Sequence, residues 1–422
     1  MTTELLRHLE ETQFWPAERL RADQDRRLAV LAGHFASESP WFRRRMHAAG
    51  ARADELRTVD GLQAVPVLGR RDVQAAGEEL FTAAIPPGHA PTSDAKTSGS
   101  TGEPVVVRRT GVTGLWWLAT TLRSYRWWSL DPGARVSVIR AGGLTEYAER
   151  ATWGVPMSLI GPTGPSQSIP VTTDIEEQVR LLNRFEPGLL LVYPTGLAAL
   201  IRAGARLPSL HRLLTIGETL SAELRAEATT ELGVVVHDTY SSQELGNIAV
   251  ECTAGSYHAV ETVVVEILDD AGRACGPGEI GRVVVTDLTN FATPLIRYDI
   301  GDYAEVGGAC DCGRGLPTLQ RVLGRERNLL HLPDGRRHWP LVGFSRFREV
   351  APVVQYQVVQ HDLDDIELRV VAERPLAPQQ EAALAGVLVA ALGHPFPVRI
   401  TEHDGRLATG PNGKFEEFVS HL

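Results

Sequence analysis

Short, continuous apolar runs alternate with helix-like segments in the middle of the chain, and this alternation narrows the folds that the chain can adopt. The runs cover residues 189–193, 212–216 and 234–238, and the segments between them lie near 196–204 and 221–232. Strands that are buried on both faces have this continuous apolar character, and their alternation with helices is typical of βαβ units. The sequence therefore predicts an α/β fold whose large domain contains a parallel sheet.

Polar residues follow each of these three runs, at the point where the predicted strand ends. The three ends are residues 193–195, 216–218 and 238–241. In open α/β sheets, ligands bind beyond the carboxyl ends of the strands. We therefore expect these three ends to contribute to one site.

The rest of the chain differs in character from this middle part. Residues 1–90 are typical of helices and loops, and residues 258–323 have alternating, β-branched patterns with turns. After Gly324-Arg325 a new α+β pattern begins, with strands near 353–360 and 364–372 and a helix near 378–392. We expect a large N-terminal domain at 1–324, with a helical cap at 1–90 and a β-rich subdomain at 258–323, and a small α+β C-terminal domain at 325–422.

Charge and composition exclude several classes of protein. The 422 residues include 42 basic and 52 acidic side chains, a formal charge of −10, which argues against nucleic acid as the main partner. No segment approaches the roughly 20 apolar residues that cross a bilayer, and the first residues lack the apolar run of a signal peptide. Four cysteines are too few for a disulfide scaffold. We therefore expect a cytoplasmic globular protein without a membrane partner.

The segment from Lys96 to Pro104, KTSGSTGEP, concentrates glycine and hydroxyl side chains ahead of an apolar strand. Backbone N–H and hydroxyl groups in such a segment can surround a phosphate chain without steric conflict. It is not a Walker loop, because its lysine comes first. Taken alone, the segment fits a phosphate-binding loop and a flexible Ser/Gly loop equally well.

Further motifs follow this loop in order, and together they make the chain resemble the adenylate-forming enzymes. The resemblance is to their phenylacetate–CoA ligase-like branch and covers about residues 90–415. The matching segments are Gly217-Glu218, DTYSSQELG at 238–246, TPLIRYDIGD at 293–302, GRERN at 324–328 and GPNGKF at 410–415. The resemblance implies a large adenylation domain followed by a mobile C-terminal lid.

The resemblance also implies an enzyme that uses ATP and Mg²⁺ to convert a small carboxylic acid, aryl by preference, to its acyl-adenylate, with release of pyrophosphate. Its catalytic residues would be Lys414 on the lid loop, Glu244 as the Mg²⁺ ligand, and Arg297, for which a phosphate contact and a plain ion pair both stay open. Tyr240 would stack on adenine and Asp302 would hold the ribose hydroxyls. The residues implied in ATP or AMP binding are Thr97, Ser98, Gly99, Ser100, Thr101, Gly102, Gly217, Glu218, Asp238, Tyr240, Ser241, Asp302 and Arg325. By order of occurrence, the walls of the acid pocket would be Gly142, Tyr147, Trp153 and Tyr193.

These residue types suit that chemistry. Attack of a carboxylate on the α-phosphorus is accelerated mainly by positioning and by neutralisation of charge. A hard cation that bridges phosphates prefers a carboxylate oxygen, as Glu244 would supply. A lysine on a glycine-containing loop, such as Lys414, can enter and leave the site with the lid.

Three cysteines and a histidine form a second pattern, Cys252, His258, Cys310 and Cys312. Three thiols and one imidazole suit tetrahedral zinc and leave no position open for water. Some members of the resembled branch carry a similar set that binds zinc, and the alternative is reduced thiols packed in a core. We expect a structural zinc site with Cys275 outside it. The tryptophan pairs at 116–117 and 127–128 are expected to serve core packing on a helix.

The hinge departs from the pattern of the branch. The family usually has aspartate or lysine at the position of Arg327 and aspartate at that of Asn328, and the phenylacetate ligases continue with a glycine-containing stretch that helps to admit CoA. Residues 329–337 read LLHLPDGRR here, which resembles the capsule-biosynthesis-associated relatives. Adenylation is therefore expected, and the acceptor stays open among CoA, a carrier-protein thiol and an amine.

Other interpretations of the sequence stay open. The same fold could activate a non-carboxylate acid such as nitrite for transfer to an amine, or the chain could be a non-catalytic nucleotide-binding relative. A homodimer is expected only by analogy with relatives.

Overall fold

The computed structural model describes the chain except for residues 53–55, 98–103, 142–144, 326–328, 339–343, 406 and 408–416. The described residues form two compact units. The larger unit comprises most of residues 1–322, and the smaller one comprises residues 323–422 together with 221–227.

A mixed sheet of 12 strands runs through the larger unit in the order β11-β12-β13-β14-β10-β9-β8-β7-β6-β3-β5-β4. The strands β5, β3, β6, β7 and β8 pair in parallel, which confirms the predicted parallel sheet. β4 pairs antiparallel with β5 at the edge. The bounds in this half are β3 (Val136–Arg140), β4 (Ala148–Arg150), β5 (Ser166–Pro170), β6 (Leu189–Val192), β7 (Arg212–Ile216) and β8 (Val236–Ser242).

The other half of the sheet is largely antiparallel, because β8 turns directly into β9 through a tight hairpin. β9 pairs antiparallel with β10, which in turn pairs with β14. The expected β-rich character of residues 258–323 is present in this half. Its strands are β9 (Gly246–Glu251), β10 (Tyr257–Ala259), β11 (Val263–Leu268), β12 (Ile280–Asp287), β13 (Tyr298–Val306) and β14 (Thr318–Arg325). A separate hairpin joins β1 (Thr92–Lys96) to β2 (Val106–Thr110).

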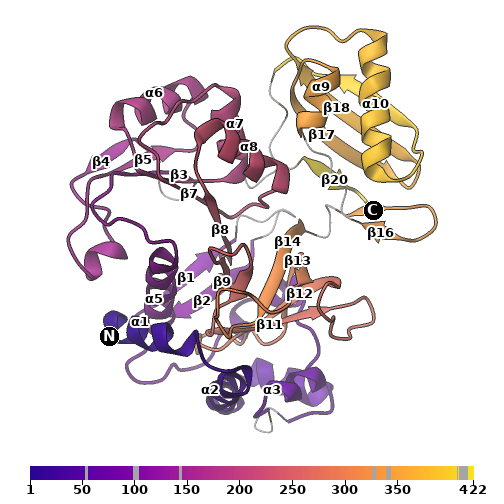
Figure 1. Cartoon of the computed structure of the whole chain (residues 1–422). Coiled ribbons are helices and arrows are strands. Elements are labelled where there is room, and N and C mark those ends of the chain that lie inside the picture. The colour runs from indigo at the N-terminus through magenta and orange to yellow at the C-terminus, as the bar shows by residue number, and fades with distance from the viewer. Residues whose placement is uncertain are drawn as a thin grey trace. The chain divides into compact units, whose positions relative to one another are not determined.

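Helices cover this sheet, and several begin at a side chain that caps them. Thr110 accepts a hydrogen bond from the N–H of Thr113 at the start of α5, and Asp174 accepts one from Glu176 at the start of α6. α6 and α7 lie on one side of the parallel strands and α5 on the other (Figure 1). The helices are α1 (Thr2–Thr12), α2 (Ala17–Glu38), α3 (Pro40–Ala48), α4 (Arg70–Ala76), α5 (Gly111–Trp127), α6 (Ile175–Phe185), α7 (Pro194–Arg202) and α8 (Ala222–Leu232). Short 3-10 turns lie at 60–64, 77–80 and 157–159.

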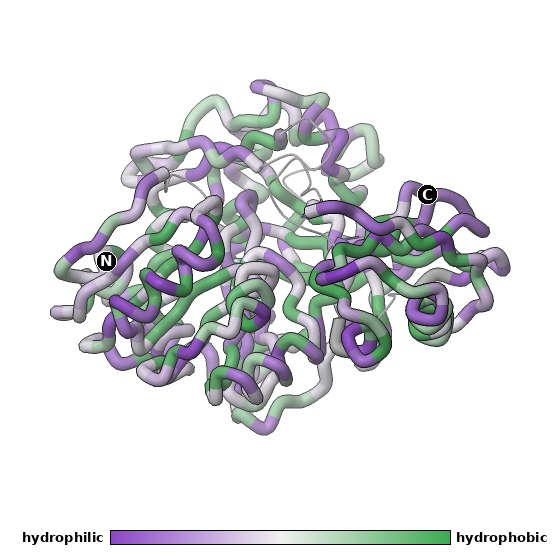
Figure 2. Tube along the Cα trace, turned by 90° about the horizontal axis from the view of Figure 1, so that it is seen from above, coloured by the Kyte–Doolittle hydropathy of each residue, from purple (hydrophilic) through white to green (hydrophobic). Residues whose placement is uncertain are grey.

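The core of the larger unit follows the strands. Figure 2 shows apolar stretches in the interior of the trace, while the coils at its periphery mix polar and apolar positions. Ile248, Ala249 and Val283 have no exposed surface. Burying a large aliphatic side chain contributes about 1.5–3 kcal/mol, so these strands form a rigid base for the polar residues at their ends.

The smaller unit is an α+β domain, as predicted. Its four-stranded sheet has the order β19-β18-β17-β20, and α10 carries Leu384, Leu388 and Leu392, spaced four residues apart and fully buried. The elements are a hairpin of β15 (Leu330–His331) and β16 (Arg337–His338), α9 (Phe344–Val350), β17 (Val353–Asp362), β18 (Asp365–Ala372), α10 (Pro378–Leu392), β19 (Val398–Glu402) and β20 (Phe418–Ser420). Among the described residues of the whole chain, no helix has the length and apolar character needed to cross a membrane.

Candidate functional site

Two hydrogen bonds join the end of β8 and its hairpin to β13, and both involve residues predicted to bind the nucleotide or its metal. The hydroxyl of Tyr240 donates to Oδ2 of Asp302 at 2.8 Å, and the hydroxyl of Tyr298 donates to Oε1 of Glu244 at 3.3 Å. Tyr240 and Glu244 are four residues apart on one segment, and their partners are four residues apart on the other, so the two contacts follow one another along the paired segments. The proposed adenine, ribose and metal residues therefore lie along one short stretch at the carboxyl end of β8.

Arg70 is the residue at this site that sequence reasoning missed. Its Nη1 lies 3.8 Å from Oε1 of Glu244, and its Nη2 donates to Oγ1 of Thr97 at 3.0 Å. Glu244 is 6% exposed, so the neighbouring cation compensates a carboxylate that is largely withdrawn from water. The segment around Arg70 carries only a helix-start signal, in which Asp72 accepts from the N–H of Gly69 at 2.9 Å.

Thr97 fixes the entry to the predicted phosphate loop. Its N–H donates to the carbonyl of Val105 at 2.9 Å, and its Oγ1 accepts from the N–H of Val105 at 2.9 Å. The β1–β2 hairpin thus brings the two ends of the loop together beside Arg70. The other predicted loop residues, Ser98, Gly99, Ser100, Thr101 and Gly102, lie outside the described residues.

Arg297, for which a phosphate contact and an ion pair were both considered, forms the ion pair in this structure. Its Nε pairs with Oε2 of Glu266 at 3.0 Å, and its Nη1 donates to the carbonyl of Val65 at 2.7 Å. Arg297 is 6% exposed, so its guanidinium is held inside the fold. The ion-pair alternative therefore describes this side chain.

Arg297 instead positions the segment that leads to Arg70. Its carbonyl accepts the N–H of Leu68 at 2.8 Å, and the N–H of Asp299 donates to the carbonyl of Leu68 at 2.9 Å. The left-handed backbone of Arg297, with φ +52°, is uncommon for a residue other than glycine. Its N–H donates to Oγ1 of Thr286 at 2.9 Å, which helps to stabilise that conformation.

We expect Arg297→Ala to lower the free energy of unfolding by about 3 kcal/mol, because it leaves the largely buried carboxylate of Glu266 without its main counter-ion. Burial raises the pKa of Glu266, and Arg297 opposes that shift. Without Arg297, the Glu266 carboxyl keeps its proton in the folded state at pH values where it releases that proton in the unfolded state. The variant therefore loses stability as the pH rises above the ordinary pKa of a glutamate. Denaturant unfolding at about pH 5 and about pH 8 measures this, with the larger penalty expected at the higher pH. A penalty that is the same at both values would contradict the role.

Other predicted nucleotide residues lie at the ends of the parallel strands, where some are engaged within the sheet. Asp238 is 4% exposed and accepts from Thr215 at 2.5 Å and from Tyr257 at 2.7 Å, so its carboxylate ties three strands together. Glu218 accepts from the N–H of Thr195 at 2.9 Å in the first turn of α7. Gly217 has φ +78°, which only glycine adopts readily, and Ser241 pairs with Asn247 across the hairpin.

Tyr147, Trp153 and Tyr193, the predicted acid-pocket residues that the structure describes, make their hydrogen bonds in different places around β3 and the sheet edge. The hydroxyl of Tyr193 accepts from the N–H of Ala141 at 3.2 Å, at the carboxyl end of β3. Trp153 lies at the opposite end of that strand, where its Nε1 donates to the carbonyl of Ala134 at 2.8 Å. Tyr147 accepts from Arg184 at 2.8 Å in an exposed cluster at the sheet edge.

Three further predicted site residues remain, Gly142, Lys414 and Arg325. Gly142 and Lys414 lie outside the described residues. Arg325 closes β14 and belongs to the smaller unit.

The four predicted zinc ligands are brought together by the pairing of β10 with β14. Their sulfur and nitrogen ligand atoms all lie within 4.8 Å of one another. The Sγ atoms of Cys252 and Cys310 are 3.6 Å apart, and Sγ of Cys312 lies 3.2 Å from Nε2 of His258. Tetrahedral zinc with bonds of about 2.3 Å places neighbouring sulfur atoms about 3.8 Å apart, so the cluster has the dimensions of such a site.

The surroundings of the cluster also suit a metal. His258 has no exposed surface, and burial lowers its pKa to about 4, so the ring is neutral, the form that ligates zinc. Its Nδ1 faces the carbonyl of Leu316 at 3.4 Å, which leaves Nε2 toward the thiols. Burial raises the pKa of the Cys252 thiol to about 11, a cost that a bound cation would reverse. Cys275 lies apart from the cluster, near the carbonyl of Ile280.

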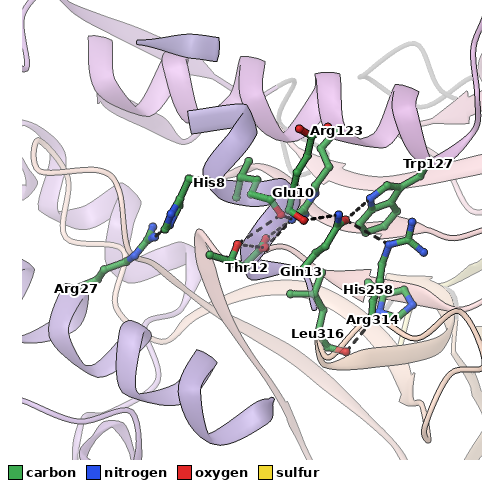
Figure 3. A network of polar contacts seen from close by, with 12 residues as sticks. His8, Glu10, Thr12, Gln13, Arg27, Arg123, Trp127, His258, Arg314 and Leu316 are labelled. Carbon is green, nitrogen blue, oxygen red and sulfur yellow. Dashed lines mark hydrogen bonds and ion pairs between the residues drawn. The ribbon is translucent and has the colours of Figure 1, made fainter. Parts of the chain in front are cut away.

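The loop that carries Cys310 and Cys312 is docked on the end of α1 (Figure 3). Gly315 donates its N–H to the carbonyl of Gln13 at 2.9 Å, and a Cβ at Gly315 would lie 1.9 Å from the carbonyl oxygen of Trp15. Oε1 of Gln13 accepts from Nε1 of Trp127 at 2.6 Å, and the guanidinium of Arg314 lies 4.0 Å from the centre of that indole. The Trp127 ring also meets His258 edge-on, with centroids 5.8 Å apart.

Comparison with known proteins finds relatives that share sequence with most of this chain. A scan against models of known protein families finds no match. The phenylacetate–coenzyme A ligase of Thermus thermophilus is 26% identical over 388 residues, which cover 86% of this chain and 84% of that protein. The Escherichia coli enzyme of the same name is 27% identical over 327 residues, which cover 74% of this chain and 72% of that enzyme. These relatives support the adenylate-forming superfamily, and within it the phenylacetate–CoA ligase-like branch that the motifs resemble.

Solved structures of adenylate-forming ligases share the fold. A 2-hydroxyisobutyryl-CoA ligase in complex with an acyl-AMP superposes with a TM-score of 0.78 at 17% identity, covering 97% of this chain and 91% of that one. An anthranilate CoA ligase in complex with anthranoyl-AMP gives a TM-score of 0.58 over 76% of this chain and 64% of its own. Together, the sequence relatives and the shared fold support an ATP-dependent adenylate-forming ligase.

Proposed function

We propose that this ligase adenylates a small carboxylic acid, aryl by preference, and transfers the acyl group to CoA. A carboxylate oxygen attacks the α-phosphorus of ATP while the bond to pyrophosphate breaks. The acceptor sulfur then attacks the acyl carbon, and AMP leaves. The observation that supports the proposal is the pair of contacts Tyr240–Asp302 and Glu244–Tyr298, which join the residues to which we assign nucleotide and metal binding.

The residues of the larger unit have separate tasks in this proposal. Tyr240 and Asp302 would bind adenine and ribose. Thr97 would begin the phosphate-binding loop, and Arg70 would add positive charge beside the phosphates. Because Glu244 offers a buried carboxylate in this position, it would hold Mg²⁺, which supplies charge neutralisation to the phosphate oxygens when bound.

The acceptor distinguishes two versions of the proposal. The curated relatives named phenylacetate–coenzyme A ligase support CoA. A specific observation favours an amine as the second candidate, since the fumarate–(S)-2,3-diaminopropanoate ligase of Enterobacter agglomerans is 29% identical over 168 residues. That match covers 37% of this chain and 42% of that enzyme. CoA is therefore the first acceptor to test.

ATP–pyrophosphate exchange tests the first half-reaction. We expect exchange with one class of acid in a panel of aryl and short aliphatic acids that includes nitrite. Thioester formation with CoA, and amide formation with 2,3-diaminopropanoate and other amines, then test the acceptor, and light scattering tests the proposed homodimer. A response to nitrite alone would replace carboxylate activation, and nucleotide binding without any exchange would support a non-catalytic relative.

Lys414 allows the two half-reactions to be separated. We expect Lys414→Ala to abolish adenylation, because the ammonium group would no longer stabilise the charge that develops at the α-phosphate, and to spare transfer from a preformed acyl-adenylate. Arg336→Ala, which removes an exposed cation paired with Asp334 in the smaller unit, serves as the control. Equal loss of both half-reactions in the Lys414 variant would remove this residue from its assigned role.

We also propose that Cys252, His258, Cys310 and Cys312 bind a structural zinc ion. The close grouping of the four ligand atoms and the buried, neutral imidazole support this site. All four ligand positions are filled by protein side chains, so the ion would stabilise the fold rather than act on a substrate.

A further inference from the structure

Trp117 is exposed on a helix whose other tryptophans are engaged, contrary to its expected role in core packing. It is 41% exposed, whereas Trp127 and Trp128 at the end of α5 are 8% and 2% exposed. The neighbouring Trp116 lies 4.7 Å from the guanidinium of Arg27 and meets the ring of His8 at 6.2 Å. Single exposed apolar side chains are common on protein surfaces, so the neighbours of Trp117 decide whether it has a role.

The indole of Trp117 lies against the hairpin that carries the metal-binding carboxylate. A Cβ at Gly246 would lie 3.1 Å from Cδ1 of Trp117, so the ring packs on the bare backbone at that glycine. Gly246 lies two residues after Glu244 and has φ +76°. A side chain at 246 would therefore both strain the turn and displace the indole.

Two further hydrogen bonds fix the helix to this hairpin. Nδ2 of Asn247 donates to Oγ1 of Thr120 and to Oγ1 of Thr121, each at 3.1 Å. Both threonines lie within about one helical turn of Trp117, so the position of the indole relative to Glu244 is set by α5 and not by a flexible loop. A rigid aromatic surface of this kind is suited to selecting a ligand by shape.

We propose that Trp117 forms a wall of the acid-binding pocket and selects planar, apolar acyl groups. This inference rests on the proposed adenylation. The acid must bring its carboxylate to the α-phosphorus, beside the phosphates and the cation that Glu244 would hold, so its acyl group lies within a few ångström of the Glu244 hairpin. Tyr240 and Asp302 account for the nucleoside, and the exposed indole provides an apolar face for the acid.

The energetics favour an aromatic or otherwise flat acyl group. An aromatic pair contributes about 0.5–1.5 kcal/mol beyond the area that it buries. Covering the exposed indole on binding adds the hydrophobic term, about 25 cal/mol per Å² of apolar surface. A charged or strongly hydrated acyl group would gain neither contribution.

The test compares Trp117→Ala and Trp117→Phe with Trp116→Ala in ATP–pyrophosphate exchange. Trp116→Ala removes an indole of the same helix that faces Arg27 and His8, so it controls for a general effect on α5. For the preferred acid we expect Trp117→Ala to raise KM about 10-fold with an unchanged KM for ATP, and to improve the relative use of bulkier acids. Trp117→Phe should keep most of the wild-type preference.

Two results separate failure of this inference from failure of the proposed function. If wild-type protein catalyses exchange but the acid profiles of Trp117→Ala and Trp116→Ala coincide, or if KM for acid and ATP rise together, Trp117 is not a pocket wall. If wild-type protein supports no exchange with any acid, the adenylation itself is wrong. Circular dichroism and melting curves of the three variants show whether each one folds.

Discussion

Glu244→Gln should reduce acid-dependent ATP–pyrophosphate exchange by about 100-fold or more, since the buried carboxylate proposed to hold the phosphate-bridging cation would lose its charge. The substitution keeps the size of the side chain, and the amide oxygen can still accept from Tyr298. The fold should therefore be retained. The loss of charge leaves Arg70 without its acidic neighbour, which favours the anionic nucleotide over the cation.

Calorimetric titration provides a readout besides turnover. We expect ATP alone to bind Glu244→Gln at least as tightly as the wild type, whereas the gain in affinity on adding Mg²⁺ should shrink about 10-fold or more. Glu177→Gln is the matched control, because Glu177 forms a surface ion pair with Arg180 on α6. If the Mg²⁺ dependence of binding and exchange stays at the wild-type level, Glu244 is not the metal ligand.

The sequence predicted the parts of the fold that depend on local pattern. The continuous apolar runs at 189–193 and 212–216 contain the parallel strands β6 and β7. A strand that is buried on both faces carries apolar side chains on both of them, so its sequence is a continuous apolar run. The grouping of Cys252, His258, Cys310 and Cys312 was also predictable, since three thiols and an imidazole together suit a shared metal ion. In each case the residue types alone restrict the chemistry.

Side-chain direction was not predictable from the sequence. Arg297 lies five residues before Asp302, but its left-handed backbone and its bonds to Glu266 and Val65 direct the guanidinium into the fold. Arg70 is an ordinary arginine at a helix start, and only the pairing of Leu68 with β13 carries it to Glu244. Both outcomes depend on contacts between segments that are far apart in the sequence. Val65 and Arg297, for example, are more than 200 residues apart.

The directions of the two adjacent tryptophans on α5 were also not predictable from the sequence. Trp116 and Trp117 are adjacent, and hydrophobicity does not distinguish them. Trp116 meets Arg27 of α2 and His8 of α1, and Trp117 meets the hairpin at Gly246. Which one faces the site depends on where α1 and α2 dock, which no pattern within α5 specifies.

Removal of the zinc ligands should have the second large effect. We expect Cys252→Ala and Cys310→Ala to lose the bound zinc and to lower the melting temperature by about 10 °C, because structural zinc contributes its binding free energy directly to folding. Cys275→Ala is the matched control, since Cys275 lies apart from the cluster. Metal analysis of protein purified without a chelator should give about one zinc ion per wild-type chain.

Loss of the zinc ligands should also destabilise the N-terminal helix α1. The cysteine-bearing loop holds α1 through the bond from Gly315 to Gln13, and Gln13 is in turn bonded to Trp127, which packs on His258. Arg123 and Glu261 form a buried ion pair at 2.6 Å beside this network, and Thr12 donates to the same carboxylate at 2.8 Å (Figure 3). Without zinc the loop loses its anchor, so amides in α1 should exchange with deuterium faster while those of α10 in the other unit keep their rates.

This difference between α1 and α10 separates a zinc-dependent clamp from a general loss of stability. Equal acceleration in both helices would show that the cluster stabilises the chain without a specific link to α1. Wild-type protein without zinc, with the same melting temperature as Cys252→Ala, would show that the four residues are reduced thiols and an imidazole packed in the core. The grouping of four ligand atoms at zinc-like spacing around a buried imidazole leads us to expect the opposite result.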